Sequence, residues 1–227
     1  MTCVVKIAPW PLAAVLAAIP VVAFAAGPYL FQETFDDGSL DGAATVAGEW
    51  AVQSGALHGI GMGGRVDYVA TTPIGVADYD VSATVRLTAG WASAGVITRF
   101  ADRANYYYAT LDSRAVGAGD PSRSLALYKV SPNPTEADSL LSGLLYEGAY
   151  YHLLAGVAFP AQLNQSYELS LGVSGDTLSV SVDGVVMFSA GDFDDALTVP
   201  GAAGLFSYQT DAVFDNWRVQ ARKGNRK

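Results

Sequence analysis

The residues best suited to chemistry are tyrosines and charged residues on neighbouring predicted strands. Side chains alternate along a strand, so one parity places five of them on a single sheet face: Arg99, Tyr106, Tyr108, Asp112 and Tyr128. Trp91 lies in a glycine-flanked loop that precedes these strands. Aromatic rings stack on sugars, and fixed donors and acceptors bind hydroxyls, so this face suits a glycan. The alternative is an ordinary sheet face, because tyrosine is a common strand residue.

Paired carboxylates would instead indicate glycoside hydrolysis, which needs two acids flanking the scissile bond. Glu33 and Asp37 share a strand parity, but Asp37-Gly38 is typical of a turn. The two histidines, His58 and His152, have no HxxxH spacing and so do not indicate zinc chemistry. A hydrolase site is therefore an alternative that no motif supports.

Two glycine-containing motifs resemble a dinucleotide-binding site and a calcium-binding loop. Residues 59–64 match GxGxxG, but residues 65–69 have the pattern of a strand, whereas a dinucleotide site needs a helix there. Residues 37–42 resemble the start of an EF-hand loop, but the twelfth position is Gly48, which offers no side-chain ligand. Both are expected to be loops.

The elements that must position the candidate face follow a period of two, interrupted every eight to twelve residues by Gly, Pro, Asn or Asp. This pattern predicts an all-β, antiparallel two-sheet β-sandwich. We predict strands at residues 29–35, 50–53, 65–71, 79–88, 94–100, 106–112, 124–130, 151–156, 166–173, 177–182, 185–189, 204–209 and 212–219. Asp183-Gly184 should form a two-residue hairpin turn. Residues 130–149 are expected to form a long excursion between strands.

Composition limits the partners of the chain. Its 227 residues hold 13 Lys and Arg against 22 Asp and Glu, for a formal charge of −9. Five of the basic residues stand in the last ten positions, so the body is more acidic still. Nucleic acid and other unaided polyanions are therefore excluded as partners.

The first residues have the features of a targeting segment. A short start with one lysine precedes an almost wholly apolar stretch, and Ala23-Phe24-Ala25 fits a signal peptidase site. We predict a signal peptide at residues 1–25, one domain at 26–222 and a basic tail at 223–227. The alternative is an uncleaved anchor, which three prolines in the apolar stretch disfavour. The protein is thus expected to be secreted, extracellular or periplasmic, without stable membrane insertion after cleavage. Because the one cysteine, Cys3, lies in this segment, no disulfide is expected.

A series of short motifs resembles a known fold family. In order, they are Phe31-x-x-x-Phe35-Asp36-Asp37-Gly38, Gly95-Val96-Ile97-Thr98-Arg99-Phe100, Asn105-Tyr106-Tyr107-Tyr108, Leu125-x-Leu127-Tyr128-Lys129-Val130, Val182-Asp183-Gly184 and Phe214-Asp215-Asn216-Trp217-x-Val219. The series resembles the concanavalin A-like lectin and glucanase jelly rolls, in particular laminin-G-like modules of secreted polysaccharide-active proteins.

The resemblance implies a jelly roll and several possible functions. Related jelly rolls often hold calcium between their first and last strands, and the matching residues here are Glu33, Asp36 and Asp215. The family's glucanases carry ExDxE or ExDxxE on one strand, and its lyases carry Arg-x-Glu-x-Arg and Gln-x-His strands. Neither pattern occurs in this chain.

We therefore expect a secreted, non-catalytic, lectin-like module that binds a polysaccharide or glycan on the concave sheet face. The first alternative is a small secreted glycan-active enzyme, either a glycoside hydrolase or a polysaccharide lyase of jelly-roll type. The second alternative is a structural or adhesive surface domain.

Overall fold

A computed structural model describes residues 29–60, 66–90, 92–113, 121–133, 149–193, 196–198, 200–208 and 211–222. Within these ranges the chain forms fifteen strands and one short 3-10 helix, η1 (Pro121–Arg123). The strands are β1 (Tyr29–Glu33), β2 (Ala43–Ala47), β3 (Glu49–Gln53), β4 (Ala56–Ile60), β5 (Val66–Thr71), β6 (Tyr79–Leu87), β7 (Ser93–Asp102), β8 (Asn105–Asp112), β9 (Leu125–Ser131), β10 (Tyr150–Val157), β11 (Ser166–Ser174), β12 (Thr177–Val182), β13 (Val185–Gly191), β14 (Ala202–Tyr208) and β15 (Asp211–Ala221).

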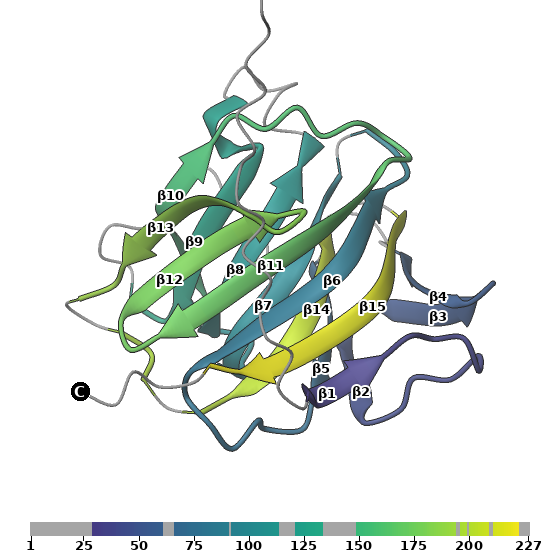
Figure 1. The fold of residues 1–227 in the computed structure, drawn as a ribbon, viewed down its shortest axis with the longest axis horizontal. Helices are drawn as coiled ribbons and strands as arrows, with labels where there is room; N and C mark the ends of the chain where they lie inside the picture. Colours follow the sequence, from purple (N-terminus) through teal and green to yellow (C-terminus); the bar gives the residue numbers. More distant parts are fainter. Residues whose placement is uncertain are drawn as a thin grey trace, which may run out of the picture.

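The strands form two antiparallel sheets that pack face to face, as predicted (Figure 1). The eight-stranded sheet has the order β13-β12-β11-β6-β15-β4-β3, and β1 pairs with β15 beside β4. The seven-stranded sheet has the order β10-β9-β8-β7-β14-β5-β2 and lies behind it in Figure 1. This arrangement is an all-β sandwich of the jelly-roll class.

All thirteen predicted strands are confirmed, with small differences at their ends. The first and last strands pair, with Phe31 opposite Val219. The Asp183-Gly184 turn has φ values of 51° and 76°, as a two-residue hairpin between β12 and β13 requires. Two strands were missed, β2 and β4.

Several predictions fall outside the described residues. These are the signal peptide at residues 1–25, the basic tail at 223–227, Trp91, and most of the excursion at 130–149. The described residues contain no helix long and apolar enough to cross a membrane.

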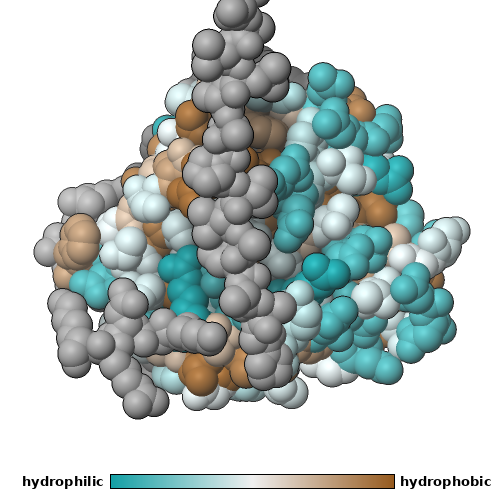
Figure 2. Space-filling model, in the orientation of Figure 1, coloured by the Kyte–Doolittle hydropathy of each residue, from teal (hydrophilic) through white to brown (hydrophobic). Residues whose placement is uncertain are grey.

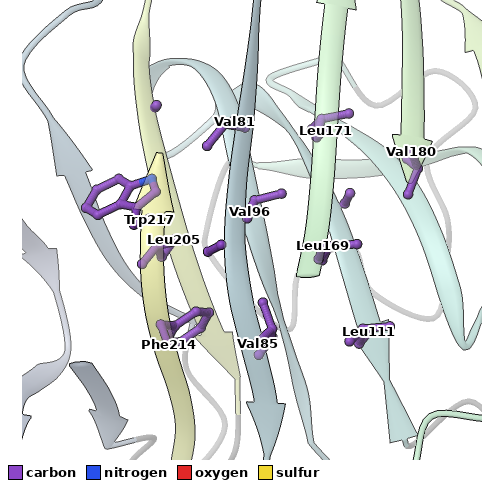
Figure 3. Close-up of a cluster of buried hydrophobic side chains, with 14 of the residues drawn as sticks. Val81, Val85, Val96, Leu111, Leu169, Leu171, Val180, Leu205, Phe214 and Trp217 are labelled. Atoms are coloured by element: carbon purple, nitrogen blue, oxygen red, sulfur yellow. The ribbon is translucent and has the colours of Figure 1, made fainter. Parts of the chain in front are cut away.

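The main core lies between the two sheets. Along β6 every second residue is buried. The buried side chains lie beside those of β11 and β15 in the same sheet and pack against those of β7 in the other sheet. Trp217 and Phe214 fill this core from β15, and both are fully buried (Figure 3). The ring of Trp217 meets that of Phe31 edge to face, with centroids 4.6 Å apart, which joins the terminal strands.

A second apolar cluster covers the other face of the seven-stranded sheet. It is rich in aromatic residues and gathers side chains from β5, β7, β8, β9, β10 and β14. The seven-stranded sheet is therefore buried on both faces along its central strands, which explains why β7 and β9 show little alternation in burial.

Replacing Leu171 with alanine should lower the free energy of unfolding by about 2–5 kcal/mol, because it opens a cavity in the main core. Val185 is 57% exposed, so Val185→Ala is the matched control and should cost less than about 1 kcal/mol. Urea unfolding of both variants measures the difference. Equal losses would contradict the placement of β11 in the core.

Candidate functional site

The predicted tyrosine face exists, but it is buried. Tyr106, Tyr108 and Tyr128 lie on the same face of the seven-stranded sheet, as their parity predicts, and are 1%, 5% and 4% exposed. The rings of Tyr108 and Tyr128 stack with centroids 5.0 Å apart. The hydroxyl of Tyr106 hydrogen-bonds that of Tyr68 at 2.8 Å. We call this surface the tyrosine face; its aromatic residues are Tyr68, Phe100, Tyr106, Tyr108, Tyr128, Tyr151, Phe206 and Tyr208. A cavity lined by several of these side chains has a volume of about 10 Å³.

Burial also affects the acid–base chemistry of these tyrosines. It raises the pKa of Tyr68 and of Tyr106 well above the ordinary value for a phenol. The pKa of Tyr151, whose hydroxyl interacts with both, is raised for the same reason. These phenols therefore stay protonated near neutral pH and are poorly suited to abstract a proton, as a lyase would require.

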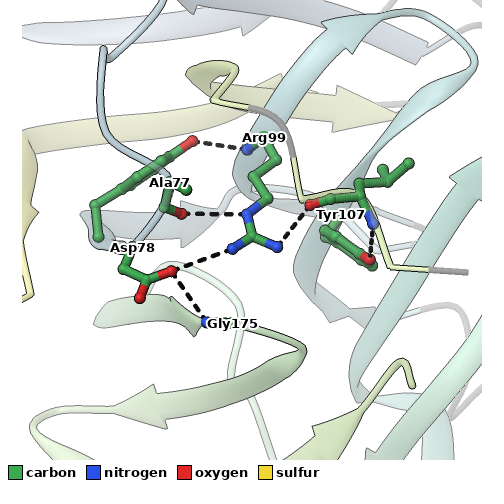
Figure 4. A network of polar contacts seen from close by, with 7 residues as sticks. Ala77, Asp78, Arg99, Tyr107 and Gly175 are labelled. Atoms are coloured by element: carbon green, nitrogen blue, oxygen red, sulfur yellow. Dashed lines mark hydrogen bonds and ion pairs between the residues drawn. The ribbon is translucent and has the colours of Figure 1, made fainter. Parts of the chain in front are cut away.

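Arg99 does not join the tyrosine face. It lies at an irregularity of the β7–β8 pairing with φ of 51°, and its side chain turns toward Ala77 and Asp78, which precede β6 (Figure 4). The guanidinium donates to Ala77 O at 3.2 Å and to Leu197 O at 2.6 Å, and it pairs with Asp78 at 3.3 Å. Its side chain is 1% exposed, so these contacts hold it in a structural position.

A neighbouring network of hydrogen bonds and an ion pair holds the segment after β13 against the seven-stranded sheet. The hydroxyl of Tyr107 donates to Asp192 Oδ2 at 2.6 Å and accepts from Leu197 N at 2.7 Å. Lys129 lies directly opposite Tyr107 and contacts the same carboxylate oxygen at 2.9 Å. Both positive and negative groups are largely buried here, so they compensate one another.

Asp112, the remaining acidic residue of the predicted glycan face, lies at the end of a strand. Asp112 ends β8 and is half-buried, and its backbone N donates to Ser124 O at 2.9 Å.

Glu33 caps the loop after β1: Oε1 accepts from the backbone N of Thr34 and of Phe35, and Oε2 from that of Asp41. Asp215 Oδ1 accepts from Asn216 N at 2.6 Å. Among the described residues, Asp36 included, no three acidic, histidine or cysteine side chains are grouped so as to hold a metal ion. Calcium at Glu33, Asp36 and Asp215 stays a prediction.

A hollow lined mainly by polar residues opens on the outer face of the eight-stranded sheet, over β15, β6, β11 and β12. Its volume is about 220 Å³, and we call it the serine hollow. This sheet faces the viewer in Figures 1 and 2, and hydrophilic residues predominate on the right-hand side of the face in Figure 2. The residues that define the hollow are Ser82, Ser170, Ser179, Ser181, Gly172 and Arg218.

The register of four strands builds the floor of the hollow. Ser181 lies opposite Ser170, Ser170 opposite Ser82, and Ser82 opposite Arg218. Neighbouring strands are about 4.8 Å apart, so this row carries three hydroxyls at that spacing and ends at a guanidinium. Each hydroxyl both donates and accepts hydrogen bonds. The small side chains leave room above the sheet.

One end of the hollow is closed by a charge pair. Arg222 donates to Asp80 Oδ1 at 2.8 Å through Nε and to Ser179 Oγ at 2.8 Å through Nη2. It lies across Gly172, where a Cβ atom would stand 1.9 Å from Arg222 Nη2. Glycine at this position is what allows the guanidinium to lie flat on the sheet.

The sequence analysis did not identify the serine hollow. The alternation of serines along residues 177–182 was visible, but it predicts only which residues share a face. The hollow forms because β12, β11, β6 and β15, which are distant in sequence, meet in one register. An unusual run of small polar residues at outward positions of adjacent strands was the available signal.

Asp67 is the most perturbed carboxyl group of the described residues. It is 4% exposed, lies against the backbone of Gly48, and its Oδ2 has no hydrogen-bond partner there. Burial, with a smaller effect from the charge of Glu49, raises the pKa of Asp67 to about 6. It points away from solvent and so is suited to no substrate.

Comparisons with known proteins identify the fold. No protein-family model matches the chain, and no curated protein sequence matches it. The carbohydrate-binding module CBM66 from Bacillus subtilis is similar with a TM-score of 0.60 and 18% identity, over 79% of this chain and 96% of the module.

Two further structures are similar to this chain. The exoplasmic/lumenal domain of VIP36, in a Ca²⁺/Man3GlcNAc-bound form, has a TM-score of 0.56 and 12% identity, over 86% of this chain and 89% of that one. The transglycosylase Crh5 has a TM-score of 0.57 and 11% identity, over 85% of this chain and 84% of that one. At these identities the likeness shows the fold alone, an all-β jelly-roll sandwich, and function must be argued from the site.

Replacing Asp67 with asparagine should stabilise the protein at neutral pH. The raised pKa means that the folded state binds the proton more tightly than the unfolded state, so the contribution of Asp67 is full below about pH 4 and is lost as the pH rises through about 6. The free energy of unfolding of the asparagine variant, relative to the native protein, should therefore increase by about 3 kcal/mol between about pH 4 and about pH 7.5. Urea unfolding at both pH values measures it, and a difference independent of pH would contradict the burial of an ionisable group here.

Proposed function

We propose that this jelly roll is a non-catalytic carbohydrate-binding module whose ligand, a polysaccharide or glycan, lies in the serine hollow. The observation that carries the proposal is the row of hydroxyls on adjacent strands, open to solvent and bordered by charged groups of both signs. Such a surface offers donors and acceptors at fixed positions, which is what a hydroxyl-rich ligand needs. The predicted glycan site on the tyrosine face stays as the second candidate surface.

The size of the hollow suits part of a sugar chain. About 220 Å³ is below the ~300–1,000 Å³ of typical pockets for drug-sized ligands. A short stretch of a longer chain can lie across the sheet while the rest stays in solvent. Tyr29, which is 40% exposed at the margin of the hollow, offers a ring for contact with a sugar.

The similar structures support a glycan as the ligand class. One is named as a carbohydrate-binding module, and another holds a glycan in its crystal. A transglycosylase has the same fold, so an enzyme that acts on glycans is the alternative to a binding module.

The carboxylates of the hollow are poorly placed for glycoside hydrolysis. Asp80 lies opposite Gly172, whereas Glu168 is four residues further back on β11. Strand geometry puts their Cα atoms roughly 14 Å apart, so both side chains would have to extend toward each other to bring the carboxyl groups within the ~9.5 Å that glycoside cleavage allows. Asp80 instead turns to Arg222, with which it is paired at 2.7 Å. This supports binding over hydrolysis.

The localisation belongs to the same proposal. We take residues 1–25 as a secretory signal cleaved after Ala25, which would bring the module to extracellular or periplasmic polysaccharides. A calcium ion at Glu33, Asp36 and Asp215 would stabilise the junction of the terminal strands rather than contact the glycan.

Residues 26–227 should bind one or more polysaccharides without releasing sugars. A glycan array and a pull-down with insoluble polysaccharides, each with and without chelator, measure binding, and assays for reducing ends and unsaturated sugars test the supernatant. Ser170→Val should weaken binding by about ten-fold or more, because it removes one hydroxyl and fills the floor. Thr45→Val is the matched control, since Thr45 is exposed on β2 of the other sheet, and it should leave binding unchanged.

Other results would lead to other conclusions. Loss of binding in Tyr128→Phe but not in Ser170→Val would move the ligand to the tyrosine face. Released sugars would make the protein an enzyme. Absence of binding to every glycan would favour a structural or adhesive domain.

A further inference from the structure

The serine hollow ends at a cation that has no acidic partner among the described residues. Arg218 Nη2 donates to Asn216 Oδ1 at 3.2 Å, and its Cζ lies 5.6 Å from the centre of the Tyr29 ring. Its Nε is buried and has no hydrogen-bond partner in the described part of the chain. By contrast, Arg222 is paired with Asp80, and Arg99 with Asp78. Because Arg218 lines the hollow, the terminal nitrogens of its guanidinium, rather than the buried Nε, are the donors that a ligand can reach.

The position of Arg218 links these donors to the hydroxyl row. It lies directly opposite Ser82 on β6, and Ser170 and Ser181 continue the row on β11 and β12. An anionic oxygen beside Arg218 would also be within reach of Ser82. A guanidinium group binds a carboxylate, or two oxygens of a sulfate, through two parallel hydrogen bonds.

We infer that the glycan bound in the serine hollow carries an isolated anionic group, a sugar carboxylate or sulfate, which Arg218 binds while neutral sugar hydroxyls lie along Ser82, Ser170 and Ser181. This rests on the proposed function, since it specifies the ligand class of the same site. The Tyr29 ring flanks the guanidinium and limits its access to water on that side.

The charge of the protein restricts how many anionic groups the ligand has. The chain carries a net charge of −9, and Glu168 lines the hollow on β11, with its Cα roughly 12 Å from that of Arg218 by strand geometry. A polyanion would place further negative charges near Glu168 and near Asp80. A chain with one acidic residue among neutral sugars avoids this repulsion.

The test compares three oligosaccharides that differ at one residue: a glucuronate-bearing one, the same compound with the carboxyl reduced to an alcohol, and a sulfated one. Isothermal titration calorimetry with residues 26–227 measures their affinities. We expect at least one anionic form to bind about ten-fold or more tightly than the reduced form, and the preference to fall as salt rises from about 50 mM to about 500 mM. The two anionic arms show whether the group is a carboxylate or a sulfate.

Arg218→Gln should abolish this preference, so that the anionic and reduced forms bind the variant with the same affinity. Arg86→Gln is the matched control, because Arg86 lies on the outer side of β6 with the same charge but does not line the hollow. If both variants lose affinity equally, the effect is general electrostatic attraction and the inference is wrong. Equal binding of anionic and reduced forms would overturn the inference and leave the proposed function standing.

A measurement on the native protein guards against misfolding of the variant. The Arg218 Nε–H resonance in ¹⁵N NMR should shift on addition of the preferred anionic oligosaccharide and not on addition of the reduced form. If the Arg218 resonance does not shift while resonances of other residues do, the inference is overturned. Failure of all three compounds and of neutral polysaccharides to bind would overturn the proposed function with it.

Discussion

The buried guanidinium of Arg99 holds one end of the sandwich together. It connects β7 to the segment before β6 through Ala77 and Asp78, and to the segment before β14 through Leu197. Asp78 also accepts from Gly175 N, in the turn between β11 and β12. A charge that is 1% exposed costs much free energy unless it is fully satisfied, so these partners must keep their places. Gly201 packs so closely that a Cβ atom would stand 2.5 Å from Arg99 C.

Both outer faces depend on the register of the strands that begin near this end. β6 begins beside Asp78, and its alternation then points valines into the core and Asp80 and Ser82 outward. The same register aligns β11 and β12 beside it. On the seven-stranded sheet, alternation places tyrosines outward, where aromatic burial stabilises them. The two outer faces therefore differ: one is packed with aromatic rings, and the other keeps hydroxyls in contact with solvent.

The sequence predicted most of the fold because a sandwich of this kind is encoded by local alternation. β2 and β4 were missed because alanine and glycine make up much of both, and such residues give a weak strand pattern. The tyrosines were assigned to the correct face, but parity cannot reveal that their rings pack against one another. Arg99 was misplaced because an irregularity in the pairing changes the direction of its side chain. The serine hollow was missed because the sequence shows the outward serines of each strand but not the order in which the four strands lie side by side.

The electrostatics of the described residues fit reversible binding better than proton transfer. A catalytic acid or base needs a pKa near the working pH and contact with the substrate. Asp67 has a pKa of about 6 but is enclosed, and the tyrosines of the tyrosine face have pKa values raised further from neutrality. In the serine hollow, Asp80 is paired with Arg222, and the groups that face a ligand are hydroxyls, Arg218 and the single carboxylate of Glu168. Such groups form hydrogen bonds without exchanging protons, and a carbohydrate-binding module requires no more.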